Sequence, residues 1–212
     1  MVRVGTAGAA IYVHENLVRE SSIFFKGMLA HNWKESTDRI VLLPYDDPII
    51  FNIYVQWKYK GKILSATADQ DDENQEEWLR LVQAYVLGDK LQDAAFKDAV
   101  LDSIIAKSNV AVNGFHYFPI QNITTFIYAN TVPKSPLRRL IVDQHVYHGQ
   151  ATWMENASVD DLDKEFLFDL SIAFLENRPQ PLGLAPDKFG VTCMYHEHDG
   201  DGSKCYKTKK LL

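Results

Sequence analysis

Near the N-terminus, short apolar runs change from the spacing of strands to the spacing of helices. Val2 to Gly5 and Ala9 to Val13 are brief apolar runs separated by a Gly-containing turn, and this pattern predicts a hairpin. From Asn16 to Ala30 the apolar residues recur at helical spacing, which predicts two short helices. Ser21 or Ser22 is the expected N-terminal cap of the second one.

A longer amphipathic helix is predicted to begin at Asp47-Pro48. The carboxylate of an Asp at this place accepts hydrogen bonds from free N–H groups, and Pro at the first helical position loses no hydrogen bond. Gly61 is the expected end of the helix. Four apolar side chains follow the start at helical spacing and are expected to face the core: Ile50, Ile53, Tyr54 and Trp57.

Two further apolar stripes predict a helical hairpin that turns at Gln92 to Ala94. The acidic segment Asp69 to Glu77 before it is expected to be a solvated connector. The first stripe consists of Trp78, Leu81, Val82, Tyr85 and Leu91. The second consists of Phe96, Val100, Ile104 and Ile105.

A Gly- and Pro-containing segment, Asn113 to Gln121, predicts the boundary of a first domain. Beyond it, Ile123 to Tyr128 predicts a helix that ends before Pro133. Ser135-Pro136 repeats the pattern of a cap followed by Pro, and it begins a helix with Leu137, Leu140, Ile141 and His145 on one face. Glu165 to Glu176 is apolar on nearly all sides, which is typical of a helix that is buried between layers or covered by a partner.

Composition narrows the class of protein. The chain has 212 residues, enough for one compact domain and an appendage, and its 46% apolar content with four Trp, ten Tyr and eleven Phe is typical of a folded chain. A net charge of −6 disfavours non-specific binding to nucleic acid. No apolar run is long enough to span a membrane, and no secretory leader is visible. These features predict a protein of the cytoplasm or nucleus in which two Cys serve as thiols or metal ligands.

Several short motifs, in order, carry a resemblance to a known family. They are Tyr12-Val13-His14, Leu17, Ser21-Ser22-Ile23-Phe24-Phe25, Met28 and Trp33-Lys34-Glu35-Ser36, then Ile40 to Pro44 with Asp46-Asp47-Pro48, then Phe51, Tyr54, Trp57, Tyr59, Gly61 and Ile63, and finally Leu81, Ala84, Tyr85, Leu87, Gly88 and Asp89-Lys90-Leu91. Together they resemble a BTB/POZ domain of the fungal type. The resemblance covers roughly residues 2 to 108, and in it Ile40 to Leu43 is the third strand.

The resemblance implies an α+β fold, the BTB/POZ fold, in which a small sheet is covered by a helical bundle and a C-terminal helical extension follows. The expected organisation is a BTB/POZ domain at 1–110, the extension at 113–178 and a loop-rich tail at 179–212. The family is a protein-interaction module, so no catalytic residue, required cofactor, nucleic acid, membrane or small-molecule substrate is expected. His14 is structural in the family.

In cullin-binding members, an apolar-x-Glu triplet contacts the ubiquitin-ligase scaffold, and Trp33-x-Glu35 has that place here. The resemblance therefore gives Trp33, Glu35 and Met28 as partner-binding residues of a cullin adaptor or self-association domain. Alternatively, Trp33 packs on the domain's own helices and Glu35 faces solvent. A stand-alone scaffold or transcription-associated dimerisation module without a ubiquitin role also stays open, as does the choice between monomer and homodimer.

The tail contains one set of residue types that bind metals: Cys193, His196, His198 and Cys205. Two thiolates and two imidazoles suffice for a tetrahedral zinc site, and four protein ligands would make that zinc structural. A polar tail without metal and a Cys193–Cys205 disulfide are the alternatives. The sequence has no phosphate-binding loop with the required Lys and no Gly-x-Ser-x-Gly nucleophile motif.

Overall fold

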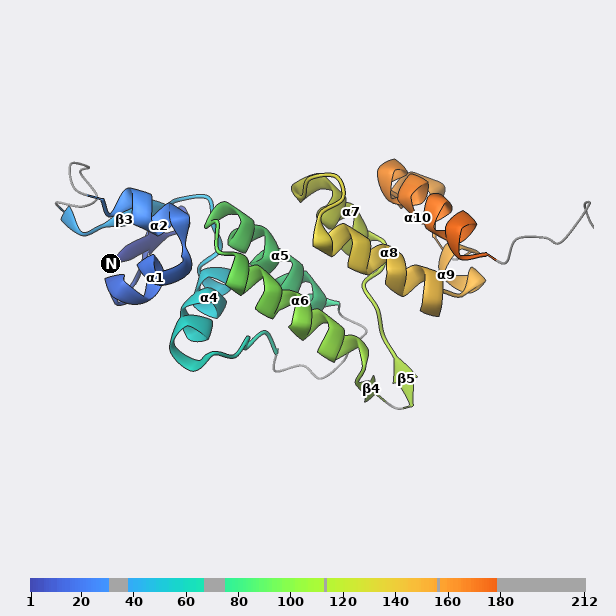
Figure 1. Ribbon diagram of the computed structural model, residues 1–212, viewed down its shortest axis with the longest axis horizontal. Coiled ribbons are helices and arrows are strands. Elements are labelled where there is room, and N and C mark those ends of the chain that lie inside the picture. The colour runs from blue at the N-terminus through green and yellow to red at the C-terminus, as the bar shows by residue number, and fades with distance from the viewer. Residues whose placement is uncertain (31–37, 67–74, 113, 156, 179–212) are drawn as a thin grey trace, which may run out of the picture. The chain divides into compact units, whose positions relative to one another are not determined.

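The computed structural model describes residues 1–30, 38–66, 75–112, 114–155 and 157–178 (Figure 1). Its contacts group residues 1–174 into one compact unit and residues 175–212 into a second. The described residues form a mostly helical fold with a small three-stranded sheet, which agrees with the predicted α+β class. No helix among them is long and apolar enough to cross a membrane.

The three-stranded sheet has β1 (Val2–Val4) at its centre, between β2 (Ala9–Ile11) and β3 (Val41–Leu43). β2 pairs antiparallel with β1 through the predicted hairpin, whose Gly5 and Gly8 both have a positive φ, and β3 pairs parallel with β1. Parallel pairing requires a crossover connection between β1 and β3. The inward side chains of the two parallel strands are buried: Val2, Val4, Val41 and Leu43.

Two short helices, α1 (Glu15–Ser21) and α2 (Ile23–Met28), lie in this crossover. Ser22 separates them, and its hydroxyl accepts a hydrogen bond from the backbone N–H of Phe25 at 3.1 Å, so the predicted cap is confirmed. Phe25 is fully buried and its ring stacks on Tyr54, with 6.3 Å between ring centroids. The sequence between the strands therefore forms the predicted pair of helices because one Ser ends the first and begins the second.

Helix α4 (Pro48–Lys60) begins and ends as its sequence predicts. The Asp47 carboxylate accepts a hydrogen bond from the backbone N–H of Ile49 at 2.6 Å, and Gly61 ends the helix in the left-handed conformation with φ of 65°. Of the stripe predicted to face the core, three side chains are buried and Trp57 is partly buried against them.

Helices α5 (Glu76–Lys90) and α6 (Ala94–Ser108) form the predicted hairpin and run side by side in Figure 1. All five apolar residues of the first predicted stripe are buried, and three of the second are. Ile105 was expected in the core but is 42% exposed, because the inward face of α6 turns through Phe96, Val100 and Ile104. Glu76 and Glu77 were expected in a connector, yet they lie in the first turn of α5. Carboxylates there interact favourably with the positive end of the helix dipole.

After α6, a second small sheet pairs β4 (Ala111–Val112) antiparallel with β5 (Phe115–His116). This sheet was not predicted, since strands of two residues leave no periodic pattern in the sequence. The predicted helices follow as α7 (Asn122–Asn130) and α8 (Pro136–His148), and Ser135 caps α8 through the N–H of Arg138 at 3.3 Å.

The remaining elements are α9 (Ala151–Glu155), the 3-10 turn η2 (Val159–Asp161) and α10 (Lys164–Asn177). His145 of α8 is buried beneath them, with Phe166 at 4.9 Å and Trp153 at 5.4 Å between ring centroids. Its Nδ1 lies 2.8 Å from the carbonyl oxygen of Ile141, which can only accept, so Nδ1 carries the proton. Burial lowers the pKa of His145, against the smaller opposing effect of that hydrogen bond.

This lowered pKa predicts that acid weakens the fold. As the pH falls below about 6.5, the His145 imidazole binds a proton more readily in the unfolded chain than in the folded chain. The free energy of unfolding therefore decreases. Denaturant unfolding at a series of pH values checks this expectation. His145→Leu should flatten the dependence and the exposed-site control His148→Gln should keep it; equal slopes for all three proteins would contradict the assignment to His145.

Candidate partner-binding surface

The described part of the predicted contact set is at the end of α2. Met28 is the last residue of this helix, where it is partly buried and packs against the core. Trp33 and Glu35 lie outside the described residues, so their proposed contact role stays a prediction. We call Met28–Ala30 with Asp38 and Arg39, which flank residues 31–37, the α2-end region.

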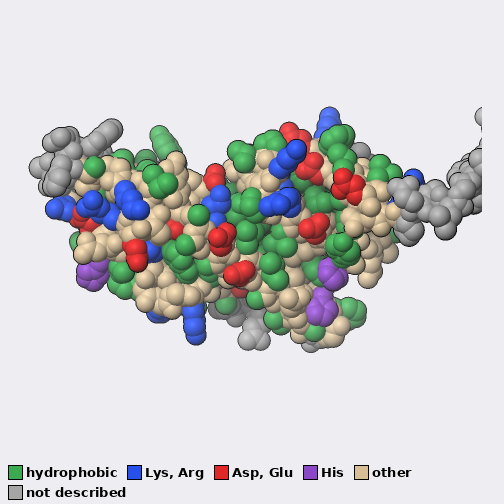
Figure 2. Space-filling model, in the orientation of Figure 1, with side chains coloured by type: hydrophobic (Ala, Val, Ile, Leu, Met, Phe, Trp, Pro, Cys, Tyr) green, Lys and Arg blue, Asp and Glu red, His purple; other side chains and the backbone are tan. Residues whose placement is uncertain are grey.

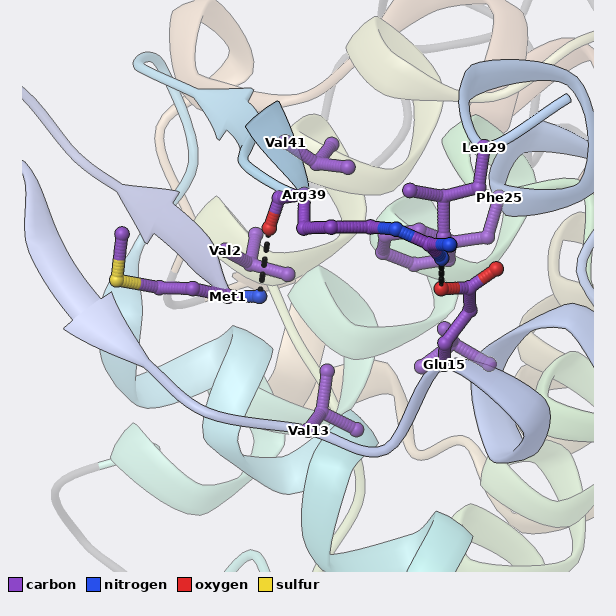
Figure 3. Close-up of a pocket in the computed structure, with 9 residues that line it drawn as sticks. Met1, Val2, Val13, Glu15, Phe25, Leu29, Arg39 and Val41 are labelled. Carbon is purple, nitrogen blue, oxygen red and sulfur yellow. Dashed lines mark hydrogen bonds and ion pairs between the residues drawn. The ribbon is translucent and has the colours of Figure 1, made fainter. Parts of the chain in front are cut away.

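A small cavity lies beside the α2-end region (Figure 3). Apolar side chains from β1, α1, α2 and β3 line it, among them Val2, Val18, Phe25 and Leu29. Its volume is about 40 Å³, which holds one or two water molecules. Pockets for organic cofactors are several times larger. The cavity therefore suits, at most, a small side chain of a protein partner.

Charged side chains border this cavity. The Arg39 guanidinium extends across it to the Glu15 carboxylate, as Figure 3 shows, and Arg19 donates to the same carboxylate at 2.9 Å. The hydrogen bond from Arg19, aided by Arg39, holds the pKa of Glu15 below its usual value. Arg39 is in the left-handed conformation with φ of 54°. The Arg19 and Arg39 side chains are 43% and 63% exposed, so solvent screens both ion pairs and they add little to the stability of the fold.

A buried polar network fixes the other end of α2. The Ser22 hydroxyl donates to the carbonyl oxygen of Leu91 at 2.6 Å, and the backbone N–H of Phe24 donates to the same carbonyl at 3.3 Å. The neighbouring Ser21 hydroxyl donates to Asp93 at 2.5 Å. These bonds join α2 to the α5–α6 turn, so Met28 extends from a helix with a rigid base.

Asp93 is the centre of this network and is fully buried. Its carboxylate caps α6 through the N–H of Phe96 at 3.2 Å and accepts the Tyr54 hydroxyl at 3.0 Å. Burial, with this carboxylate close by, raises the pKa of Tyr54, so the phenol remains a donor. The Lys58 ammonium donates to Ser21 at 3.0 Å and supplies a nearby positive charge. Every polar group of the network thus has a partner, as burial requires.

A larger groove lies between the turn after β3, α5 and α7. It has a volume of about 250 Å³, and Ile50, Leu87 and Phe126 contribute apolar walls. Tyr45 lines it and is 92% exposed, and an ion pair of 2.6 Å joins Lys90 to Asp46 at the groove. Tyr45 was not predicted as a surface residue of interest because it lies in a turn outside every periodic stripe. Its position between Pro44 and the cap residue of α4 was the one feature of the sequence that could have indicated an exposed aromatic side chain.

Two further motif residues, Asp89 and His14, have structural contacts. Asp89 forms an ion pair with Lys97 at 2.6 Å. His14, which the resemblance implies to be structural, is exposed; its Nδ1 lies 2.5 Å from the Tyr59 hydroxyl, which also accepts the His14 backbone N–H at 3.0 Å. The Tyr59 hydroxyl therefore joins the N-cap position of α1 to α4.

The candidate metal ligands Cys193, His196, His198 and Cys205 lie outside the described residues, and structural zinc there stays a prediction. Within the part of the chain that the structure describes, no group of three or more His, Cys, Asp or Glu side chains could hold a metal ion. On the face seen in Figure 2, acidic and basic side chains are interspersed. The negative net charge is therefore not gathered into one patch on that face.

The chain was compared with family models and with curated proteins. No family model matches the chain, and a search of curated proteins found no match.

Proposed function

We propose that this chain is a protein-interaction module of the BTB/POZ type, with residues 1–110 as the BTB/POZ domain. The observation that carries the proposal is the order of its elements around the sheet. A hairpin leads through two short helices to a third strand that pairs parallel with the first, and α4 and a helical hairpin follow. The motif residues Phe25, Tyr54, Tyr85 and Leu91 all lie in the core of this arrangement.

The function that this arrangement supports best is that of an adaptor or self-association domain linked to a cullin-type ubiquitin ligase. Trp33, Glu35 and Met28 form the proposed contact with the cullin. Support comes from the hydrogen bonds of Ser21 and Ser22, which hold the start of α2 and so limit how far its end can move. A preorganised contact loses less entropy when the partner binds.

Titration of the full chain with the N-terminal domain of the BTB-binding cullin tests this proposal. We expect the wild-type chain to bind and Glu35→Lys to raise the dissociation constant by about tenfold or more. Loss of a single hot-spot residue typically weakens binding by at least about tenfold. Trp33→Ala is expected to have a similar effect. Binding by calorimetry and helicity by circular dichroism are measured on the same samples.

The matched control is Glu155→Lys, which makes the same charge change at an exposed position of α9. It should bind as the wild type does. Wild-type protein that shows no binding at tens of micromolar, or Glu35→Lys that binds equally well, would reject the cullin proposal. Loss of helicity in Trp33→Ala would instead identify Trp33 as a core residue.

A stand-alone scaffold or dimerisation module without a ubiquitin role is the second candidate. The observation that favours it is the exposed apolar face of α10, which includes Phe168 at 66% and Ile172 at 41% exposure. A stable oligomer that does not bind the cullin would support this candidate over the adaptor.

A further inference from the structure

Helix α10 has apolar residues on two opposite faces. Phe166 and Leu170, one helical turn apart, are 1% and 5% exposed and belong to the core. The Phe166 ring contacts Tyr128 edge-on, with 5.6 Å between ring centroids. This first face is therefore fully used by packing within the chain.

The second face carries Phe168, Ile172 and Leu175, which are 66%, 41% and 57% exposed. At 100° per residue, their spacing of four and three residues places them on one side of the helix, opposite Phe166 and Leu170. Ser171 lies on the same side, and its hydroxyl donates to the carbonyl oxygen of Leu167 at 2.7 Å. Covering this face would therefore leave no hydroxyl without a hydrogen bond.

Two charges lie at the ends of this apolar face. Lys164, Phe168, Ile172 and Glu176 follow one another at intervals of four residues and so form one row along α10. Lys164 is in the first turn and Glu176 in the last. A cation at the N-terminus and an anion at the C-terminus both oppose the helix dipole. Among the described residues, neither of them forms an ion pair that would offset this cost.

We propose that the second face of α10 binds the same face of a second copy of this chain, with the two helices antiparallel about a two-fold axis. In that arrangement Lys164 of each copy faces Glu176 of the other, and Phe168 faces Ile172. Each unfavourable charge then lies beside an opposite charge and beside the opposite end of a helix dipole. The row is complementary to itself, which is what a two-fold interface requires.

The size of the face sets the expected strength. Three apolar side chains on a helix of 14 residues bury less than the roughly 800 Å² per partner of a standard interface. We therefore expect a weak, reversible dimer in the micromolar range. This inference does not depend on cullin binding, since none of the α10 residues belongs to the contact set Met28, Trp33 and Glu35.

Sedimentation equilibrium of the full chain over a range of concentrations tests the proposal. The wild-type mass should rise from monomer to dimer. Phe168→Ser should raise the dissociation constant by about tenfold or more, as expected for an aromatic residue at the centre of an interface. Lys164→Glu and Glu176→Lys should each weaken the dimer, and the double variant Lys164→Glu/Glu176→Lys should restore it.

Lys62→Glu, an exposed charge reversal outside α10, is the matched control and should dimerise as the wild type does. A monomer at the highest soluble concentration overturns the proposal. So does a dimer that Phe168→Ser leaves unchanged, or a double variant no tighter than the single ones. Because Phe168, Lys164 and Glu176 are exposed, all variants should remain folded, and neither charge reversal should unfold at a lower denaturant concentration than the wild type.

Discussion

Replacing Asp93 by Ala is expected to lower the free energy of unfolding by about 4 kcal/mol. The carboxylate is fully buried and accepts hydrogen bonds from Ser21, Tyr54 and the N–H of Phe96. Loss of the helix cap contributes about 1 kcal/mol. Each of the two side-chain bonds to a charged acceptor contributes about 1.5 kcal/mol.

The partners that Asp93 leaves behind explain why this loss is large. Tyr54 is 0% exposed, so its hydroxyl cannot exchange the lost bond for one to water. The Lys58 side chain is 6% exposed and donates to Ser21, which loses its own acceptor when Asp93 is replaced. Disruption of the hydrogen bond to this buried ammonium adds to the cost. The same loss releases the base of α2, and cullin binding should weaken if that proposal holds.

Urea unfolding, followed by circular dichroism, measures the effect. Asp93→Asn should lose less than Asp93→Ala, because the amide oxygen still accepts the N–H of Phe96 or the Tyr54 hydroxyl. The control Asp98→Ala lies on the exposed side of α6 and should change the free energy of unfolding by less than about 0.5 kcal/mol. An Asp93→Ala protein within about 1 kcal/mol of the wild type would mean that the network contributes little.

Local features of this fold could be read from the sequence because their physics is local. Asp47 and Ser135 each precede a Pro and cap a helix, Ser22 caps α2, and Gly61 ends α4. In each case the residue type satisfies or replaces backbone groups within four positions. The buried stripes of α4 and α5 followed for the same reason, since a period of 3.6 residues identifies one face.

The polar network could not be read in this way. Asp93 was expected only in a turn, yet its partners Ser21 and Tyr54 are 72 and 39 residues away in the chain. No periodicity links such positions. The predicted contact set rests on the resemblance of ordered motifs, and only Met28 of it lies among the described residues. For α10, an apolar pattern on all sides predicted either burial within the chain or cover by a partner. Phe166 and Leu170 are buried within the chain, whereas Phe168 and Ile172 are exposed.

Arg138 is a further residue whose role depends on distant partners. It is one of two adjacent Arg residues in α8, and it is 4% exposed while Arg139 is exposed. Its guanidinium lies 4.2 Å from the centre of the Tyr128 ring and pairs with Glu165 at 2.7 Å. One nitrogen, Nη2, donates to the carbonyl oxygens of Tyr128 at 2.7 Å and Thr131 at 2.6 Å. This side chain therefore satisfies the end of α7 and joins it to α10.

Arg138→Met is expected to lower the free energy of unfolding by about 3 kcal/mol. Methionine fills the space of the stem but leaves two carbonyl groups at the end of α7 without donors. The ion pair contributes less, because Glu165 is 67% exposed and solvent screens it. Arg138→Lys should recover part of the loss, since an ammonium reaches one carbonyl but not the whole set. Arg139→Met is the matched control and should be close to neutral in urea unfolding. If both Met variants lose equal stability, the loss arises from charge on α8 in general, and the hydrogen bonds of Arg138 are not its cause.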